Sequence, residues 1–330
     1  MTGSTPTELD RAEALAEQVL QRDMPRRRML VIVNPYATTV SDRLKNLVVY
    51  ALQSRYEVEA VETEAKEHAT ALCRQAADEG YEVVVAFGGD GTVNEAANGL
   101  IGTDVPLTCL PGGSTNVFCR SLGIPRDVVD ATEHLLQLAD RFQPRRVDLG
   151  RVNGRHFTFS SGIGLDASVV EQVDAHPKLK SRYTRWYYSY VAVQQFVRKY
   201  LVHPPHVEVA VNGSKSRGVT VIVQNADPFT YFGPRPIRVN EGAALDNGAL
   251  SLTVLERASA IDMPTLIARL FSAKAKTVQR HRQVIGFQGI DYAQVRALAG
   301  TFPLQVDGDF IGDFDEASYG VVPNALAVVA

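Results

Sequence analysis

Residues 83–95 read VVVAFGGDGTVNE, and this run constrains the fold more than any other stretch of the chain. Its first five residues are all apolar, as in a strand of a parallel sheet that is buried on both faces. Gly88, Gly89 and Gly91 then surround Asp90, and a helix-like segment follows at once. The run therefore predicts a strand, a tight glycine turn and a helix, as in an α/β fold.

The glycine turn also predicts a binding site for phosphate groups. Glycine lets the backbone approach a ligand and point N–H groups at it, and a helix start adds partial positive charge. Asp90 fits beside phosphates when a divalent cation lies between them. The alternative is a purely structural turn, in which Thr92 caps the helix and Glu95 completes a capping box. A plain turn needs one glycine rather than three, so we favour a nucleotide phosphate site.

Residues 29–143 alternate strand and helix patterns, which predicts a parallel sheet with helices on its faces. The expected strands are 29–33, 56–61, 83–87 and 106–110, and the expected helices are 40–53, 66–79, 92–100, 115–122 and 127–140. Loops rich in turn residues follow three of the strands, at Asn34-Pro35, Gly88-Gly89 and Pro111-Gly112-Gly113. The carboxyl ends of parallel strands share one edge, so these loops are expected to meet at a ligand crevice.

Residues 144–330 have a different pattern, that of a largely antiparallel β domain. Short strands recur around Asn-Gly pairs, a strong hairpin signal, at Asn153-Gly154, Asn212-Gly213 and Asn247-Gly248. Helical insertions are expected near 178–201 and 262–282. Residues 1–28 form a helical extension that ends in Arg26-Arg27-Arg28, a charge run expected to be solvated. The predicted architecture is an N-terminal α/β domain followed by a mostly antiparallel C-terminal β-sandwich.

Composition and charge exclude several classes of protein. The net charge of −3 lacks the broad basic excess of a nucleic-acid-binding protein. The three cysteines show no zinc spacing, and an odd number fits a reducing compartment rather than a disulfide framework. No apolar run is long enough to cross a bilayer, and the N-terminus lacks the apolar region of a signal peptide. A cytoplasmic protein without nucleic-acid partners is expected.

Together the motifs resemble the catalytic domain of the diacylglycerol kinase family, bacterial lipid kinases related to sphingosine and ceramide kinases. The GGDGT turn alone is shared with NAD kinases and phosphofructokinases. Its companions carry the resemblance: Asn34-Pro35, PGGSTN at 111–116, VDLG at 147–150, FSSGIGLDA at 159–167 and VDGD at 306–309. The resemblance covers about residues 29–320 and implies an α/β domain of the diacylglycerol kinase and NAD kinase type.

The resemblance implies an ATP site, a magnesium site and a catalytic base. The residues expected to contact ATP are Asn34, Pro35, Tyr36, Ala37, Thr38, Thr63, Gly88, Gly89, Asp90, Gly91, Thr92, Val93, Asn94, Glu95, Gly113, Ser114 and Asn116. Asp90 and Asp148 would hold the catalytic Mg²⁺ through water. Asp309 would take the proton from the lipid hydroxyl, with Asp307 in support.

Three residues near this site depart from the family pattern. Ser114 stands where the family usually has Thr, which keeps the hydroxyl. Val117 follows Asn116 where the family often has Asp, so one carboxylate is missing from the expected metal network. Asp309 replaces the more common Glu, and its shorter side chain requires the lipid hydroxyl to lie closer.

The resemblance also implies a structural Mg²⁺ site that uses the carbonyls of Ala244 and Ala249. The family has an Asp before the turn glycine there, whereas this chain has Asn247 before Gly248. An Asn side chain offers an oxygen but no charge, which weakens the expected site.

Two motifs allow other interpretations. Residues 162–167 fit the G-x-G-x-x-[GA] pattern of dinucleotide-binding folds, but they follow a hairpin and lie outside the strand–helix region that the pattern requires. We therefore do not favour a redox enzyme. Asp307-Gly308 by itself indicates only a turn, and its catalytic interpretation depends on the resemblance.

Two long segments carry basic residues but no Asp or Glu. Residues 175–207 contain Lys178, Lys180, Arg182, Arg185, Arg198 and Lys199 among several aromatic residues, and residues 263–290 contain Arg269, Lys274, Lys276, Arg280 and Arg282. Basic groups beside aromatic rings suit a membrane interface with anionic headgroups. The alternative is that helices pack their aromatic rings into the β domain and leave the charges in water. Peripheral association with an anionic membrane is the expectation that follows.

The sequence therefore predicts an ATP-dependent lipid kinase, with diacylglycerol as the expected acceptor and phosphatidic acid as the product. An NAD kinase is a rival within the enzymes, and the acid-free segments and Asp307-Gly308-Asp309 argue against it. A second alternative, outside the enzymes, is a catalytically silent sensor of lipids or nucleotides. Val117 and Asn247 support it, because both depart from the family pattern at expected metal positions. A homodimer is compatible with the sequence.

Overall fold

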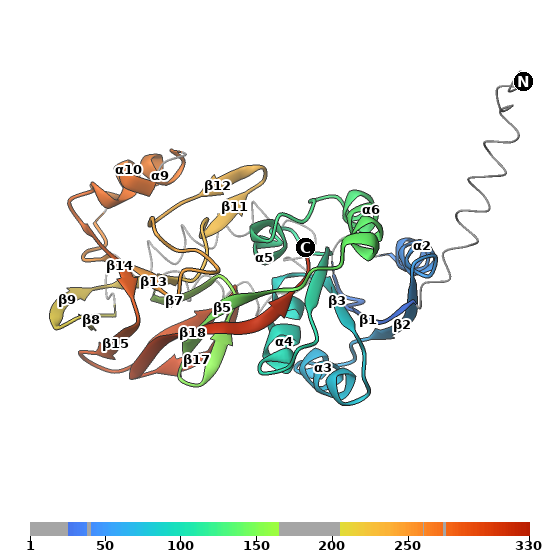
Figure 1. Ribbon diagram of the computed structural model, residues 1–330. Helices are drawn as coiled ribbons and strands as arrows, with labels where there is room; N and C mark the ends of the chain where they lie inside the picture. The colour runs from blue at the N-terminus through green and yellow to red at the C-terminus, as the bar shows by residue number, and fades with distance from the viewer. Residues whose placement is uncertain (1–25, 38–40, 165–204, 260, 273–274) are drawn as a thin grey trace, which may run out of the picture.

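The computed structural model describes residues 26–37, 41–164, 205–259, 261–272 and 275–330, and Figure 1 shows two halves side by side. The expected N-terminal helix, Thr38 and the basic residues of 178–199 lie outside the described residues. Within the part of the chain that is described, no helix is both long and apolar enough to span a membrane.

The N-terminal half is a parallel sheet with helices packed on it, as predicted. Its strands pair in the order β2-β1-β3-β4. They are β1 (Arg27–Val33), β2 (Tyr56–Glu62), β3 (Val83–Gly88) and β4 (Leu107–Pro111). The helices are α2 (Asp42–Leu52), α3 (His68–Asp78), α4 (Asp90–Leu100), α5 (Val117–Ser121) and α6 (Val128–Leu138), with the 3-10 turn η1 (Ala139–Arg141) after them. Every residue of β3 is buried, which explains its unbroken apolar run.

The C-terminal half is a β-sandwich, which confirms the predicted fold class. One sheet is antiparallel, in the order β14-β13-β10-β7-β16-β17, and the other contains β5, β6, β8, β9, β15 and β18. The strands are β5 (Arg145–Val152), β6 (Arg155–Phe157), β7 (Ser160–Gly164), β8 (Val207–Val211), β9 (Ser214–Gly218), β10 (Thr220–Gln224), β13 (Leu250–Leu255), β14 (Val284–Ile290), β15 (Tyr292–Ala297), β16 (Phe302–Val306), β17 (Asp309–Phe314) and β18 (Glu316–Val328). Apolar side chains from both sheets, among them Phe157, Ile163 and Tyr319, form the core of this half.

Shorter elements complete the C-terminal half. The hairpin of β11 (Thr230–Phe232) and β12 (Arg235–Ile237) forms a small separate sheet. Of the helical insertion expected at 262–282, the structure contains α9 (Met263–Leu270) and α10 (Ala275–Gln279). These two helices and the hairpin lie along one side of the molecule, at the top of Figure 1.

Strand β18 joins the two halves into one continuous sheet. Its first part pairs with β15, its residues from Tyr319 to Val328 pair with β5, and Val328 at its end pairs in parallel with Leu107 of β4. A register shift between Val322 and Leu326 bends the strand midway. The last residues of β18 pack in the core of the first half, although the predicted division at residues 143 and 144 assigns them to the second.

The bend in β18 is held by the buried side chain of Asp148, which is 3% exposed. Its Oδ1 atom accepts a hydrogen bond from the backbone N–H of Asn324 at 2.8 Å, inside the bend. Its Oδ2 atom accepts one from the backbone N–H of Gly248 at 2.6 Å. Through its two carboxylate oxygens, Asp148 therefore connects β5 to β18 and to the loop before β13.

The Asn-Gly pairs behave differently from one another. Asn153-Gly154 and Asn212-Gly213 have positive φ angles and connect β5 to β6 and β8 to β9, as predicted. The hairpin prediction is wrong for Asn247-Gly248, because the following strand pairs with β10 and β14 instead of β12. The polar groups of this turn are bonded elsewhere, since Asn247 donates to the carbonyl of Gly242 and Gly248 donates to Asp148.

The basic run before the sheet is partly packed instead of solvated. The guanidinium of Arg27 lies 4.3 Å from the centre of the Phe142 ring, and that of Arg28 lies 4.4 Å from the centre of the Tyr81 ring. Such stacking combines cation–π attraction with burial of the side-chain stem. Both arginines also belong to β1, so the prediction of a solvated run is wrong for them.

Asp148→Ala is expected to lower the free energy of unfolding by about 2–5 kcal/mol, because it leaves two backbone N–H groups without their acceptor. Urea unfolding followed by circular dichroism measures the change. Asp104→Ala is the control, since that carboxylate is 99% exposed, and it should change stability by less than about 0.5 kcal/mol. Equal stability of the two variants would show that Asp148 does not hold the bend.

Candidate active site

Two glycine loops at the carboxyl ends of β3 and β4 pack against each other, as predicted. The backbone N–H of Gly112 donates to the carbonyl of Gly88 across 2.8 Å. A Cβ atom on Gly113 would come within 2.8 Å of the Cα atom of Gly89, so a side chain there would push the loops apart. The close contact between the two loops therefore requires glycine at position 113.

Helix α4 begins earlier than the capping-box alternative requires. Its N-cap is Gly89, and no side chain caps the helix. Thr92 instead accepts a hydrogen bond from the Asn34 amide at 3.0 Å, and Glu95 accepts one from the backbone N–H of Ala69 at 3.3 Å. The capping-box interpretation is thus wrong, because both side chains tie α4 to neighbouring segments. The first turn of α4 keeps N–H groups that a ligand can use.

A cleft of about 290 Å³ lies where the N-terminal loops meet the C-terminal half. Six of the predicted nucleotide contacts line it, namely Asn34, Tyr36, Thr63, Gly91, Thr92 and Glu95. Asp309, the predicted base, lines it from the start of β17. The structure therefore brings the predicted nucleotide side and the predicted base together in one space.

The Asp309 carboxylate lies directly against the start of α4. A Cβ atom on Gly91 would come within 2.7 Å of the Asp309 Oδ2 atom. Glycine at this position leaves room for the carboxylate. The predicted base is consequently placed beside the backbone of the glycine turn, where helix N–H groups favour a phosphate.

The Asp90 carboxylate is bound by the loop that follows β4. It accepts hydrogen bonds from the Thr115 hydroxyl at 2.9 Å and from the backbone N–H of Phe118 at 3.3 Å. Burial raises the pKa of Asp90 to about 7, and the negative charge of Asp307 adds to the rise while the hydrogen bonds oppose it. Asp90 thereby anchors the loop after β4 to the glycine turn.

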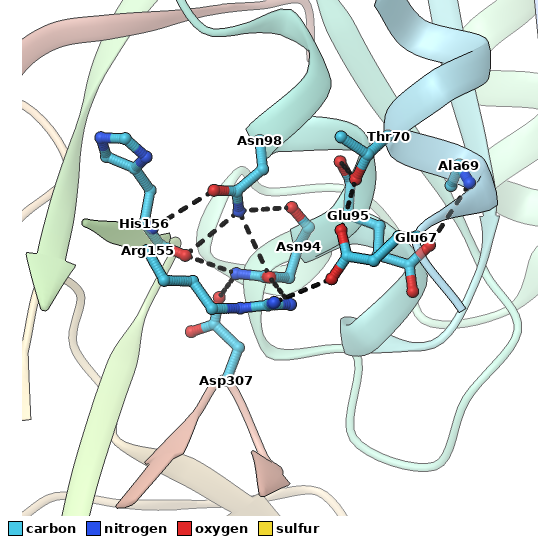
Figure 2. A network of polar contacts seen from close by, with 9 residues as sticks. All are labelled: Glu67, Ala69, Thr70, Asn94, Glu95, Asn98, Arg155, His156 and Asp307. Carbon is cyan, nitrogen blue, oxygen red and sulfur yellow. Dashed lines mark hydrogen bonds and ion pairs between the residues drawn. The ribbon is translucent and has the colours of Figure 1, made fainter. Parts of the chain in front are cut away.

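Asp307 is a buried carboxylate that joins the two halves, and Figure 2 shows it beside Asn94. Its Oδ2 atom accepts from the Asn94 amide on α4 at 2.8 Å and from the backbone N–H and hydroxyl of Thr158 at 2.6 and 2.8 Å. Its Oδ1 atom accepts from the backbone N–H groups of Phe159 and Ser160, both at 3.0 Å. Burial raises the pKa of this carboxyl, and the hydrogen bonds oppose the rise. These donors fix the turn that carries the predicted base.

The PGGSTN loop after β4 is held by a hydrogen-bonded side chain of its own. The Asn116 amide closes its own loop, since it accepts from the Gly113 N–H at 2.9 Å and donates to the Gly113 carbonyl at 2.7 Å. Ser114 is exposed outside the cleft lining. The N-cap of α5 is Asn116, in a left-handed conformation, instead of the hydroxyl residues before it. The predicted ATP contacts of this loop stay predictions.

The other predicted contacts that the structure describes, Asp90 among them, are not part of the cleft lining. Val93 and Asn94 are buried within α4. Pro35 and Ala37 lie in the loop after β1, Gly88 is the last residue of β3, and Gly89 is the N-cap of α4.

The predicted magnesium ligands have hydrogen-bond partners of their own. Both Asp148 oxygens accept backbone N–H groups, and Asn247 accepts the N–H of Ala249. Among the described residues, no three His, Cys, Asp or Glu side chains form a cluster that could hold a metal ion. Magnesium on a nucleotide keeps water and phosphate ligands and needs only one or two protein carboxylates, and Asp90 at the glycine turn fits that need. Mg²⁺, Asp148 as its ligand and the structural site with Ala244 stay predictions.

After β2, only Thr63 was predicted to be part of the site, and the three residues that follow it were not. Glu64, Ala65 and Lys66 also line the cleft, and Lys66 is the one basic residue in that lining. The segment has no glycine, so it lacks the turn signal of the other loops. Its position at the carboxyl end of a parallel strand was the signal that could have found it.

Comparisons with known families agree with this geometry. Residues 28–152 match the model of the diacylglycerol kinase catalytic domain, and residues 159–330 match that of the YegS C-terminal NAD kinase beta sandwich-like domain. Both matches therefore point to a kinase family. The chain belongs to the diacylglycerol kinase catalytic-domain family, with a C-terminal domain of the YegS type.

Individual proteins show the same likeness. A diacylglycerol kinase of Bacillus subtilis is 27% identical over 245 residues, which cover 71% of this chain and 75% of that protein. The uncharacterized protein sll0036 of Synechocystis sp. is 27% identical over 299 residues, which cover 86% of this chain but 65% of that longer protein. A crystal structure of a diacylglycerol kinase from Bacillus anthracis shares the fold, with a TM-score of 0.66 and 19% identity over 93% of this chain and 98% of that one. Yeast NADH kinase shares it more distantly, with a TM-score of 0.51 and 11% identity over 93% and 84% of the two chains.

Asp90→Asn is expected to change how stability depends on pH. Burial raises the pKa of Asp90 from 3.8 to about 7, so between these pH values the folded protein holds a proton that the unfolded chain has released. The stability of the wild type therefore falls as pH rises through this window, and the variant escapes that loss. Its free energy of unfolding relative to wild type should rise by about 1–3 kcal/mol between pH 5 and pH 8, at about 1.4 kcal/mol per pKa unit. Urea titrations across that range measure it, with Asp104→Asn as the exposed control, and a difference independent of pH would contradict the shifted pKa.

Proposed function

We propose that this protein is an ATP-dependent lipid kinase that phosphorylates the hydroxyl of diacylglycerol to give phosphatidic acid. The observation that carries the proposal is the position of Asp309, a carboxylate in contact with the glycine start of α4 within one cleft. Membership of the family supports kinase activity with ATP as the phosphate donor. The name of the Bacillus subtilis relative supports diacylglycerol as the acceptor.

The reaction needs positioning and charge neutralisation more than covalent help from the protein. N–H groups at the start of α4 bind the transferred phosphate. Asp309 accepts the proton of the lipid hydroxyl as its oxygen bonds to the γ-phosphorus, while the bond from phosphorus to the departing ADP oxygen breaks. Asp307 keeps the turn of Asp309 in place through its own five hydrogen bonds.

The charge of the cleft favours a nucleotide that arrives with a cation. Its lining contains Glu64, Glu95 and Asp309 against the single basic residue Lys66. This lining repels a triphosphate unless a divalent cation offsets part of its charge. Bound Mg²⁺ supplies that neutralisation, and Asp90 is the residue proposed to hold it.

Radiolabelled ATP offered to diacylglycerol, sphingosine and NAD in parallel tests the proposed function. Labelled phosphatidic acid is the expected product. Labelled NADP would instead indicate an NAD kinase. ATP binding without transfer to any acceptor would indicate a nucleotide sensor and contradict the proposal.

Asp309→Ala is expected to lower kcat by about 10²-fold or more while leaving ATP affinity close to that of the wild type, because a positioned base contributes on the order of 10²–10⁴ in rate. Asp309→Glu should retain more activity than the Ala variant, since it restores a carboxylate. Steady-state rates and ATP titrations measure both quantities. Asp313→Ala on the same strand is the control, as its side chain is exposed. A severe loss of ATP binding in the Asp309 variant would assign the residue to the nucleotide site instead.

Access to a lipid acceptor is proposed to use a surface formed by α9, α10 and the β11–β12 hairpin, which we term the α9 surface. Ile267 and Phe271 lie one helical turn apart and are each 46% exposed, and the Phe271 ring meets that of Phe232 edge-on with centroids 5.5 Å apart. Helix α10 packs against α9, and the exposed residues Lys276 on α10 and Arg280 directly after it add positive charge to this part of the molecule. Exposed apolar side chains flanked by basic groups suit the headgroup region of an anionic membrane. The protein is accordingly proposed to bind such membranes peripherally.

Reversing Lys276 and Arg280 to Glu should weaken binding to vesicles that contain phosphatidylserine by about tenfold or more, because each basic group near an anionic surface contributes about 1 kcal/mol. Binding by the wild type should also weaken as salt shortens the Debye length below about 10 Å. Co-sedimentation with vesicles measures both effects. Lys215→Glu is a matched control, since Lys215 is 69% exposed beside Glu208 and Lys276 is 68% exposed beside Glu241. Binding that is indifferent to the two charges and to salt would contradict this proposal.

A further inference from the structure

Glu67 adopts a backbone conformation that residues other than glycine rarely take. Its φ angle is +64°, and it stands immediately before α3, at the end of the segment that follows β2. Backbone of this kind costs free energy for a residue with a Cβ atom, so neighbouring contacts must hold it in place. The carboxylate makes two such contacts, accepting from Arg155 Nη1 at 2.8 Å and from the Thr70 hydroxyl at 3.1 Å.

Arg155 reaches Glu67 from the other half of the molecule. It lies at the start of β6, and Figure 2 shows its guanidinium between Glu67 and Asn94. While Nη1 bonds to Glu67, Nη2 donates to the Asn94 Oδ1 atom at 3.2 Å. A planar guanidinium can hold both partners at a fixed separation, which a lysine ammonium cannot do.

Asn94 passes this connection on to the turn of the predicted base. Its side chain is buried, and its amide nitrogen donates to the Asp307 Oδ2 atom at 2.8 Å and to the His156 carbonyl at 2.9 Å. Asp307 and Asp309 are two residues apart around one turn. A continuous run of polar contacts therefore leads from the cleft segment at Thr63–Glu67 to the base.

We infer that Arg155 is a positioning residue that couples the nucleotide-side segment 63–67 to the turn 307–309. The inference rests on the proposed function, since it assigns a nucleotide to one end of the run and a base to the other. Arg155 lines no part of the cleft and acts through Glu67 and Asn94. Closure of segment 63–67 on a nucleotide then also fixes the Asp309 carboxylate.

The structure indicates that an Arg155 variant can still fold. Strand β6 keeps a second attachment to α4 through Asn98, which donates to the His156 carbonyl at 3.1 Å and accepts the His156 N–H at 3.2 Å. Loss of the guanidinium thus removes the coupling, while β6 stays attached to α4 through Asn98. Glu67→Gly offers a second variant, because glycine takes a positive φ without strain and lacks the carboxylate.

The first measurement is the kinetics of Arg155→Ala, Arg155→Lys and Glu67→Gly. Misplacement of a catalytic group by an ångström can cost about 10²-fold, so kcat should fall about 10- to 100-fold in Arg155→Ala, with KM for ATP within about threefold of the wild type. Arg155→Lys should be intermediate, since it keeps the charge near Glu67 but cannot span both partners. Glu67→Gly should lose kcat although its melting temperature does not fall. Unchanged kcat in Glu67→Gly and Arg155→Ala would show that the bridge is only structural.

The second measurement is hydrogen exchange of the full-length chain with a non-hydrolysable ATP analogue. In the wild type the analogue should slow amide exchange at both 63–70 and 307–309. In Arg155→Ala it should slow exchange at 63–70 only, and protection of both segments would overturn the inference. Arg55→Ala is the matched control, because Arg55 makes an ion pair of the same 2.8 Å length with Asp140, away from the cleft. The exchange experiment contains no lipid, so its result does not depend on which acceptor the protein phosphorylates. If the wild type phosphorylates none of the acceptors, that result refutes the proposed lipid kinase activity, and the exchange experiment still decides the inference.

Discussion

The buried carboxylate of Asp307 is the interaction on which the arrangement of the active-site cleft depends. Its five hydrogen bonds come from α4 in one half and from the connection between β6 and β7 in the other. A buried carboxylate is costly unless donors surround it, so these segments must assemble together or not at all. Because Asp309, the proposed base, follows Asp307 by two residues, the same interaction that joins the halves also sets the position of Asp309 against Gly91.

The shared sheet makes this arrangement rigid. Strand β18 runs from the sandwich into the parallel sheet, and Asp148 pins its bend through the N–H of Asn324. Two domains connected only by a linker move readily relative to each other, whereas continuous backbone pairing resists such motion. The shared sheet therefore holds the two sides of the cleft together before any ligand binds. In the inferred coupling, segment 63–67 is the part that adjusts to a ligand, and its closure completes the placement of Asp309 through Arg155. Preorganisation of this kind spares the reaction the cost of moving charged groups into place.

Sequence reasoning succeeded where the signal was local and failed where it depended on tertiary contacts. The apolar run of β3 and the glycines at 88–91 have local causes, so the strand, the turn and the converging loops could be predicted. The start of α4 could not, because Thr92 and Glu95 match a capping box but bond to Asn34 and Ala69 instead.

The contacts of Arg155 with Glu67 and Asn94 could not be predicted for a similar reason. Its partners stand 88 and 61 positions away along the chain, and no spacing rule connects them. The role of Asp148 in the β18 bend was also hidden, since its partner Asn324 lies 176 positions away. The VDGD motif pointed to Asp307 only by resemblance, and its five donors are a property of the assembled fold.

Val117 shows how one departure from the family pattern fits the electrostatics of the cleft. It is 1% exposed, packs in the core and lies beside Asp90, whose pKa burial raises to about 7. A carboxylate at this position would bury a second negative charge next to the first, and like charges in one site raise each other's pKa further. The cleft already has three acidic residues against one basic residue. The apolar side chain of Val117 thus keeps Asp90 as the single carboxylate of the glycine turn. In the proposed function, neutralisation of the nucleotide phosphates is then assigned to backbone N–H groups and to a divalent cation.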